Sequence, residues 1–250
     1  MRTRIILGII AIFLISIPSC TNNNTRLQDQ NIQKASLLPV WKSETLPDVI
    51  SSDEALVRIT EGNARYVSGN NIFPDMSDNR KHEEVEGQHP FATVIGCSDS
   101  RVPVELLFDQ GIGDLFVIRT AGNAIEDKLT MGSLDYSLEH LHVKLIVVLG
   151  HEKCGGITGA ITSAEGGEKN GHSHSHDQNI NEMLTILQKG VKGYIGKTDQ
   201  LDHAIDANIK YQVELIRQSP LAKEMIENGS LKVVGARYEL EHGNVIFLDI

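Results

Sequence analysis

Apolar runs that are typical of strands alternate with helical patterns along most of the chain. The strand-like runs cover residues 91–97, 114–120, 144–151, 231–240 and 244–250, and the helical patterns lie near 102–108, 130–142, 154–164, 178–190, 200–217 and 219–228. Near-continuous apolar strands separated by helices are typical of a parallel sheet with helices on both faces. The stretch EHGN (241–244) indicates a hairpin, so the last strand is expected to be an antiparallel edge. The pattern therefore predicts an α/β fold with a mostly parallel, doubly wound sheet, in the strand order 2-1-3-4 with strand 5 at the edge.

A further helix is expected just before the first strand-like run. Ser51 and Glu54 have the spacing of a capping box, and apolar residues follow them with helical periodicity up to Val67. Gly62 weakens the middle of this helix, because glycine costs about 1 kcal/mol relative to alanine there. The chain of 250 residues is long enough for one sizeable core, which we place in residues 51–250.

The first fifty residues differ in composition from the rest. A basic start (MRTR) precedes thirteen mostly apolar residues at 5–17, which match a signal-peptide core and are too few for a membrane span. The ending at Cys20 resembles a bacterial lipoprotein box, so we expect 1–19 to be a signal peptide and Cys20 the lipidated first residue. An uncleaved anchor and cleavage without lipidation remain alternatives. Residues 20–50 are expected to form a polar tether and an extended arm.

These features predict a protein of the bacterial cell envelope, on the periplasmic side, which contacts the membrane only through its N-terminal lipid. The chain carries 23 Lys and Arg against 33 Asp and Glu, a formal net charge of −10, and has no basic cluster outside its extreme N-terminus. We therefore expect no nucleic-acid partner.

The candidate chemistry lies at the ends of two strand-like runs. Cys97 closes the first run, in GCSDSR, and LGHEKCGG places His151 at the end of the third run with Cys154 three residues later. An imidazole and a thiolate at i and i+3 on one helical turn can reach the same point. In a doubly wound sheet the carboxyl ends of strands one and three are neighbours, about 4.8 Å apart. The three side chains can therefore bind one Zn²⁺ and leave its fourth position open, as in catalytic zinc sites.

A disulfide between Cys97 and Cys154 is the main alternative to the metal site. An exported protein with three cysteines, one of them the lipidated Cys20, has an even pair left. Asp99, Arg101 and two glycines next to these cysteines favour the metal site, since a disulfide needs none of them.

A histidine-rich stretch interrupts the strand and helix pattern. His172, His174 and His176 alternate with serine inside GGEKNGHSHSHDQN (166–179). The composition predicts either a solvated loop or a loose metal-binding segment.

The paired motifs Cys97-x-Asp99-x-Arg101 and His151-x-x-Cys154, whose first residues are 54 apart, resemble those of a β-class carbonic anhydrase. The likeness runs from about 51 to 250 and includes DQGIGDLFVIRTAGN (109–123). The resemblance implies that both cysteines and the histidine hold zinc and that Asp99 is paired with Arg101. It also implies reversible hydration of carbon dioxide to bicarbonate, in a homodimer or tetramer.

The resemblance is to the plant-like branch of the family, and this branch implies a substrate-binding set. By position, Gln88, Phe116, Tyr136 and the backbone N–H of Gly155 match its substrate contacts, whereas Ala121 stands where the branch has a larger apolar residue. In this branch the Asp–Arg pair stays intact, so we expect an open fourth zinc position at pH 7. Core packing for Phe116 and an exposed loop amide for Gln88 are the alternatives.

Zinc chemistry gives the candidate reaction a physical basis. Zinc lowers the pKa of bound water, so that hydroxide can attack carbon dioxide. Two thiolates cancel the charge of the metal, however, and should leave this water less acidic than three neutral histidines would. Asp99 can accept the proton of the hydroxide in a hydrogen bond, and Arg101 can keep Asp99 ionised.

Two other functions remain open from the sequence. Hydrolysis of carbon disulfide or carbonyl sulfide on the same fold needs a comparable zinc site. A non-catalytic, zinc-stabilised envelope protein that binds bicarbonate is the alternative from a different class.

Overall fold

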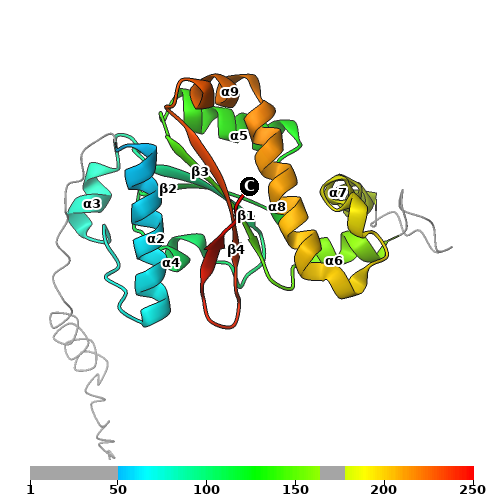
Figure 1. The fold of residues 1–250 in the computed structure, drawn as a ribbon. Coiled ribbons are helices and arrows are strands. Elements are labelled where there is room, and N and C mark those ends of the chain that lie inside the picture. Colours follow the sequence, from blue (N-terminus) through cyan, green and yellow to red (C-terminus); the bar gives the residue numbers. More distant parts are fainter. Residues whose placement is uncertain (1–49, 164–177) are drawn as a thin grey trace, which may run out of the picture. The chain divides into compact units, whose positions relative to one another are not determined.

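The computed structural model describes residues 50–163 and 178–250, which fold around one mixed sheet. Its parallel strands are β1 (Ala92–Cys97), β2 (Leu115–Thr120), β3 (Leu145–His151) and β4 (Lys232–Tyr238), and β5 (Val245–Phe247) is antiparallel to β4. The strand order is β2-β1-β3-β4-β5 (Figure 1). The predicted fold class, strand order and antiparallel edge strand are therefore confirmed.

Alternate residues of the central strands pack into two cores, one on each face of the sheet. On β3, Ile146 and Val148 belong to one core, whereas Val147 and Leu149 belong to the other. Every residue of β3 is buried. This explains the near-continuous apolar run in the sequence, because both sides of the strand are covered.

Helices cover both faces of the sheet, as the sequence predicted (Figure 1). One face carries α2 (Ser52–Ser68) and α4 (Val104–Leu107). The other carries α5 (Lys128–Glu139), α6 (Gly155–Thr162), α7 (Gln178–Gly190), α8 (Leu201–Gln218) and α9 (Pro220–Glu227). The short 3-10 turns are η1 (Ala121–Asn123), η2 (Lys192–Tyr194) and η3 (Thr198–Gln200).

The start of α2 has the predicted capping box. The backbone N–H of Glu54 donates to Oγ of Ser51 (3.2 Å), and the Glu54 carboxylate accepts from the backbone N–H of Ser51 (2.8 Å). Gly62 has a role that the sequence did not indicate: a Cβ at this position would lie 2.7 Å from the carbonyl carbon of Phe108. Glycine therefore lets α2 approach the chain that follows α4.

The helices differ from the sequence prediction in two ways: one helix was not predicted, and another has different bounds. Helix α3 (Asp78–Glu83) was not predicted, because none of its residues is buried and no apolar periodicity marks it; Oγ of Ser77 caps it by accepting from the backbone N–H of Arg80. Helix α5 spans Lys128–Glu139, whereas the pattern predicted 130–142; it starts at Lys128 because the Asp127 carboxylate accepts hydrogen bonds from backbone N–H groups of the first turn, and it ends three residues earlier than predicted. The remaining predicted helices agree within two residues at either end.

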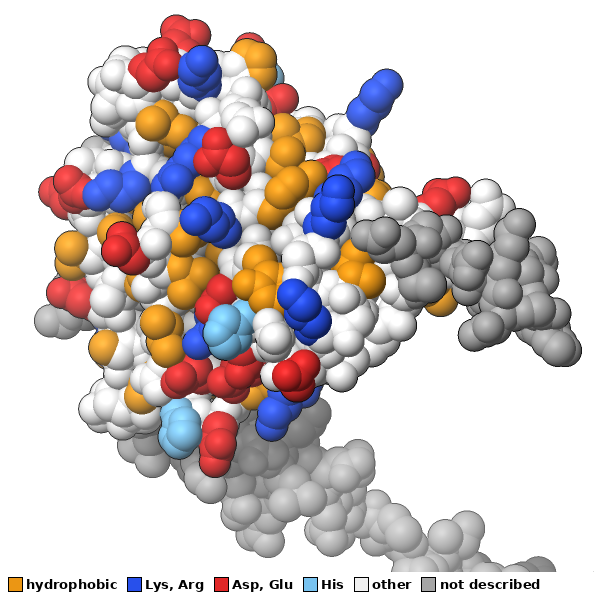
Figure 2. Space-filling view, turned by 45° about the vertical axis from the view of Figure 1, so that its right-hand side comes forward, with side chains coloured by type: hydrophobic (Ala, Val, Ile, Leu, Met, Phe, Trp, Pro, Cys, Tyr) orange, Lys and Arg blue, Asp and Glu red, His pale blue; other side chains and the backbone are white. Residues whose placement is uncertain are grey.

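Several predictions concern residues outside the described ranges. These are the signal peptide at 1–19, the lipidation of Cys20, the tether up to residue 49, and the histidines at 172, 174 and 176. Within 50–163 and 178–250, no helix is both long and apolar enough to span a bilayer. Acidic, basic and apolar side chains are interspersed over the face of the molecule shown in Figure 2.

Candidate metal centre

The fold brings the three predicted metal ligands together at the carboxyl edge of the sheet. Cys97 is the last residue of β1, His151 is the last residue of the neighbouring β3, and Cys154 immediately precedes α6. All three side chains are buried, and their ligand atoms lie within 4.8 Å of one another. Residues that are far apart in the sequence therefore share one site because β1 and β3 pair in parallel.

His151 and Cys154 do not lie on one helical turn, which corrects the local geometry expected from their spacing. β3 ends at His151, the chain turns through Lys153 in a left-handed conformation (φ 52°), and Cys154 is the N-cap of α6. The apolar run before His151 favours strand, so the two residues meet through a tight turn between a strand and a helix.

The donor atoms fit a tetrahedral zinc ion. Two sulfur ligands at 2.3 Å from such an ion lie about 3.8 Å apart, and the Sγ atoms of Cys97 and Cys154 are 3.9 Å apart. Both cysteines are free, so the structure does not form the alternative disulfide. Nδ1 of His151 lies 2.8 Å from the carbonyl oxygen of Glu152, which can only accept, so Nδ1 carries the proton. Nε2 is buried without a hydrogen-bond partner among the described residues, and its lone pair is available to a metal.

The two thiols differ in acidity. A hydrogen bond from Cys154 is the main reason why the pKa of Cys97 falls to about 4, with further hydrogen bonds from the backbone of Asp99 and Gly122. The same contact, together with burial, raises the pKa of Cys154. The hydrogen bond between the two sulfurs therefore favours one thiolate and one thiol, and a bound dipositive cation would favour ionisation of the second group.

Asp99 and Arg101 form a two-pronged ion pair beside the three ligands. Nε of Arg101 donates to Oδ1 of Asp99 (2.9 Å) and Nη2 donates to Oδ2 (2.7 Å), and the backbone N–H of Arg101 also donates to Oδ1 (2.9 Å). These hydrogen bonds lower the pKa of Asp99, so the carboxylate is ionised at neutral pH. Its Oδ2 lies 3.8 Å from Nε2 of His151, which places the negative charge next to the ligand set.

Sequence reasoning missed two residues that support the site, Arg119 on β2 and Gly122 in the η1 turn that follows it. Nε and Nη2 of Arg119 donate to the carbonyl oxygens of Cys97 (2.9 Å) and Asp99 (2.6 Å), and the backbone N–H of Gly122 donates to Sγ of Cys97 (3.3 Å). Only their position could have indicated these residues, because both lie at or just after the carboxyl end of the strand-like run 114–120, which is the neighbour of the run that ends at Cys97. A backbone donor leaves no side-chain signature in the sequence.

Comparison with known proteins agrees with this geometry. The family described as carbonic anhydrase matches residues 92–245. Carbonic anhydrase 2 of Mycobacterium tuberculosis is 35% identical over 195 residues, which are 76% of this chain and 90% of that protein. The solved structure of the β-carbonic anhydrase CcaA superposes with a TM-score of 0.58 at 26% identity, and covers 78% of this chain and 88% of that one. The chain belongs to the β-class carbonic anhydrases. A further solved structure, the β-carbonic anhydrase CafA of Aspergillus fumigatus, has a TM-score of 0.58 at 25% identity, with 79% of this chain and 90% of that chain covered.

The residues predicted to bind the substrate of this carbonic anhydrase lie in three places. Gly155 is the first residue of α6, next to the ligand Cys154. Phe116 on β2 and Tyr136 on α5 form an aromatic pair with ring centroids 6.2 Å apart. Phe116 lies four residues before the end of β2, which is about 13 Å along the strand from the ligand edge. Gln88 is exposed in the loop that precedes β1. Within one chain, only Gly155 adjoins the metal ligands, and the substrate roles of all four stay predictions.

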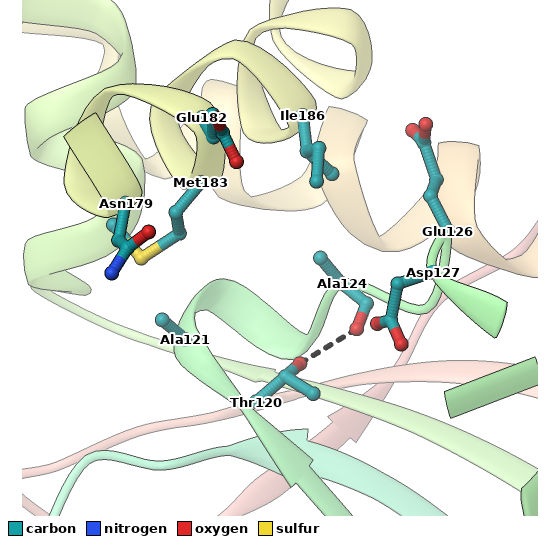
Figure 3. Close-up of a pocket in the computed structure, with 9 residues that line it drawn as sticks. All are labelled: Thr120, Ala121, Ala124, Glu126, Asp127, Asn179, Glu182, Met183 and Ile186. Carbon is teal, nitrogen blue, oxygen red and sulfur yellow. Dashed lines mark hydrogen bonds between the residues drawn. The ribbon is translucent and has the colours of Figure 1, made fainter. Parts of the chain in front are cut away.

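A pocket of about 250 Å³ opens beside the η1 turn of this carbonic anhydrase (Figure 3). Its walls combine the turn with α7; the lining residues are Thr120, Ala121, Ala124, Glu126, Asp127, Asn179, Glu182, Met183 and Ile186. Oγ1 of Thr120 donates to the carbonyl oxygen of Ala124 across the base of the turn (2.7 Å). The four predicted substrate residues do not line this pocket, whereas Ala121, the position where the plant-like branch has a larger residue, does.

Proposed function

We propose that the chain catalyses the zinc-dependent, reversible hydration of carbon dioxide to bicarbonate and a proton. The observation that carries this proposal is the buried set of Cys97, His151 and Cys154 with an ionised Asp99 held beside it by Arg101. Membership of the carbonic anhydrase family supports the reaction, and the donor set supports zinc as the metal.

Cys97, His151 and Cys154 would hold the zinc ion. When bound there, zinc acts as a Lewis acid that makes hydroxide available from water near neutral pH. Because the two thiolates offset the charge of the cation, this effect is weaker than at a site of three neutral histidines. The hydrogen bond from Nδ1–H of His151 to the Glu152 carbonyl fixes the imidazole tautomer and leaves Nε2 as the donor atom.

Asp99 is the residue that would orient the nucleophile. An ionised carboxylate can only accept hydrogen bonds, so Asp99 holds the proton of the attacking oxygen and directs a lone pair of that oxygen toward the carbon of the substrate. Arg101 engages both carboxylate oxygens at once, which fixes the orientation of Asp99 and opposes its movement onto the metal. We therefore also propose that the fourth metal position is open at pH 7.

The assembly and location remain part of the proposal. Membership of the β class favours a homodimer or tetramer. The sequence of residues 1–20 favours export to the periplasm and attachment through a lipid on Cys20, with carbon dioxide and bicarbonate as the small-molecule partners.

Stopped-flow hydration of carbon dioxide by purified protein of measured zinc content tests the proposal. Zinc-loaded wild type is expected to be active, and Asp99→Asn is expected to keep its zinc and lose most of the hydration rate. Asp78→Asn, which removes an exposed carboxylate on α3 that pairs with Lys81, is the matched control and should retain full activity. Zinc-loaded wild type that hydrolyses carbon disulfide or carbonyl sulfide but does not hydrate carbon dioxide would overturn the proposal, as would zinc-loaded protein inactive on all three.

A further inference from the structure

A chain of hydrogen bonds runs from α8 to the sulfur of Cys97. Nδ2 of Asn208 donates to the carbonyl oxygen of Gly122 (2.9 Å), and Oε1 of Gln212 accepts from the backbone N–H of Ile125 (3.2 Å). Nε2 of Gln212 donates to Oδ1 of Asn208 (3.3 Å), which links the two side chains. The backbone N–H of the same Gly122 donates to Sγ of Cys97 (3.3 Å).

Both amide side chains lie in an apolar interface. Asn208 is 1% exposed and Gln212 is 0% exposed, and their neighbours Ile209 and Val213 on the same helix belong to the core. Buried amides cost free energy unless their polar atoms are hydrogen-bonded. Apolar side chains would satisfy the packing of α8 on the sheet, so packing alone does not account for the two amides. The hydrogen bonds described above lead from these amides to the turn at 121–125.

The turn at 121–125 has an irregular backbone that is contacted by two helices. Gly122 (φ 65°) and Asn123 (φ 50°) are two successive residues in the left-handed region, which glycine and asparagine adopt more readily than other residues. On the side of α7, a Cβ at Gly122 would lie 2.6 Å from Cδ2 of the buried Leu187, so the glycine packs directly beneath this side chain. The amides of α8 and Leu187 of α7 together hold the turn in place.

We infer that Asn208 and Gln212 are positioning residues of the metal centre, which aim the Gly122 N–H at Sγ of Cys97 and so reduce the electron density that this sulfur donates to the metal. The inference rests on the proposed function only in requiring that the site holds a metal. A hydrogen bond to a thiolate stabilises the sulfur lone pairs. Removal of a group that orients a metal ligand in this way typically lowers metal affinity about 10–100-fold.

Spectroscopy of the cobalt-substituted protein, together with zinc affinity from competition with a chelator, tests this inference. Asn208→Leu removes the donor to Gly122 at similar side-chain volume. The thiolate-to-cobalt charge-transfer band should move to longer wavelength, because the sulfur lone pairs rise in energy. Zinc affinity should fall about 10–100-fold, because the turn no longer holds Cys97 in position for the metal. If Asn208→Leu does not fold, Asn208→Asp takes its place. This variant keeps the shape of the side chain but places a carboxylate against the Gly122 carbonyl, so the band should shift in the same direction.

Asn63→Leu is the matched control for loss of a buried amide. Asn63 on α2 donates to two backbone carbonyls, of Leu107 and Gly243, and accepts from the backbone N–H of Val245, in the core on the opposite face of the sheet. This variant should lose stability yet keep the wild-type band and zinc affinity.

The outcomes separate the inference from the proposed function. A cobalt spectrum of the folded Asn208 variants that matches wild type, or an equal shift in Asn63→Leu, would overturn the inference while hydration by the wild type continues to support the function. Wild type that binds metal without hydrating carbon dioxide would overturn the function alone, and the spectra would still decide the inference. Wild type that takes up neither zinc nor cobalt would overturn both.

Discussion

Replacement of Gly62 by alanine should destabilise the protein, although helix propensity alone predicts the opposite. A Cβ at Gly62 would lie 2.7 Å from the carbonyl carbon of Phe108 and 2.9 Å from Nε2 of Gln110, and closer still to the Phe108 oxygen. Since carbon atoms in contact prefer about 3.5–4.0 Å, α2 and the backbone near Phe108 must separate by about 1 Å. Overpacking of this kind costs about 3 kcal/mol at the upper end of its usual range, and the helix propensity of alanine offsets about 1 kcal/mol, which leaves a net loss of about 2 kcal/mol.

Gly132 provides a control within the same protein. It lies inside α5, and a Cβ there would have no neighbour among the described residues within 4 Å, so Gly132→Ala gains the propensity without the clash. Thermal unfolding should show a fall in Tm of about 4–8 °C for Gly62→Ala and a rise of about 1–4 °C for Gly132→Ala. A Gly62→Ala protein that is as stable as wild type would show that α2 does not approach the Phe108 backbone closely in solution, and the argument would be wrong.

The other predictions concern the metal centre. Purified protein should contain about one zinc per chain, measured by elemental analysis, and Cys97 and Cys154 should resist thiol reagents until a chelator removes the metal; native protein with no zinc and a disulfide between them would contradict the site. His151→Ala should lose zinc and stability together, because metal binding contributes to folding, whereas Asp99→Asn should keep its zinc and lose only the smaller free energy of the ion pair with Arg101, as measured by thermal unfolding. Hydrogen bonds from Arg101 lower the pKa of Asp99, so this carboxylate should stay ionised as the pH falls through the range in which an ordinary aspartate is protonated. The ion pair should therefore break only at a pH below that range. Activity should rise toward alkaline pH, since the two thiolates leave the metal-bound water weakly acidic; a flat profile between pH 7 and 9 would contradict this.

The sheet and the metal ligands were predictable because their signals are local in the sequence. Each of the five strand-like runs between 91 and 250 corresponds to one strand, and Cys97 and His151 stand at the ends of two of them, so the topology alone brings them together. Helix α3 was not predictable in the same way, because it buries none of its residues and leaves no periodic pattern.

The supporting contacts of the site were beyond the sequence for a different reason. Asn208 and Gln212 are polar residues in an amphipathic helix, and such residues are normally read as solvent-exposed, whereas here they are buried. The role of Gly62 depends on a backbone more than forty residues away, and the donor to Cys97 is a peptide N–H. Only a three-dimensional structure identifies partners of these kinds.

The parallel register of β1 and β3 would make metal binding depend on correct strand pairing. Gly96 pairs with Leu149, and Cys97 faces the same core as Ile95. A slip of β1 by one residue would move every side chain of β1 to the opposite face of the sheet, which would separate the thiolate of Cys97 from Cys154 in the same core. A chain trapped in such a slipped pairing would lack the third ligand and would bind a metal ion weakly, whereas a chain in the native register would be stabilised by the full free energy of metal binding. Metal binding would therefore favour the native register over slipped pairings of β1 and β3.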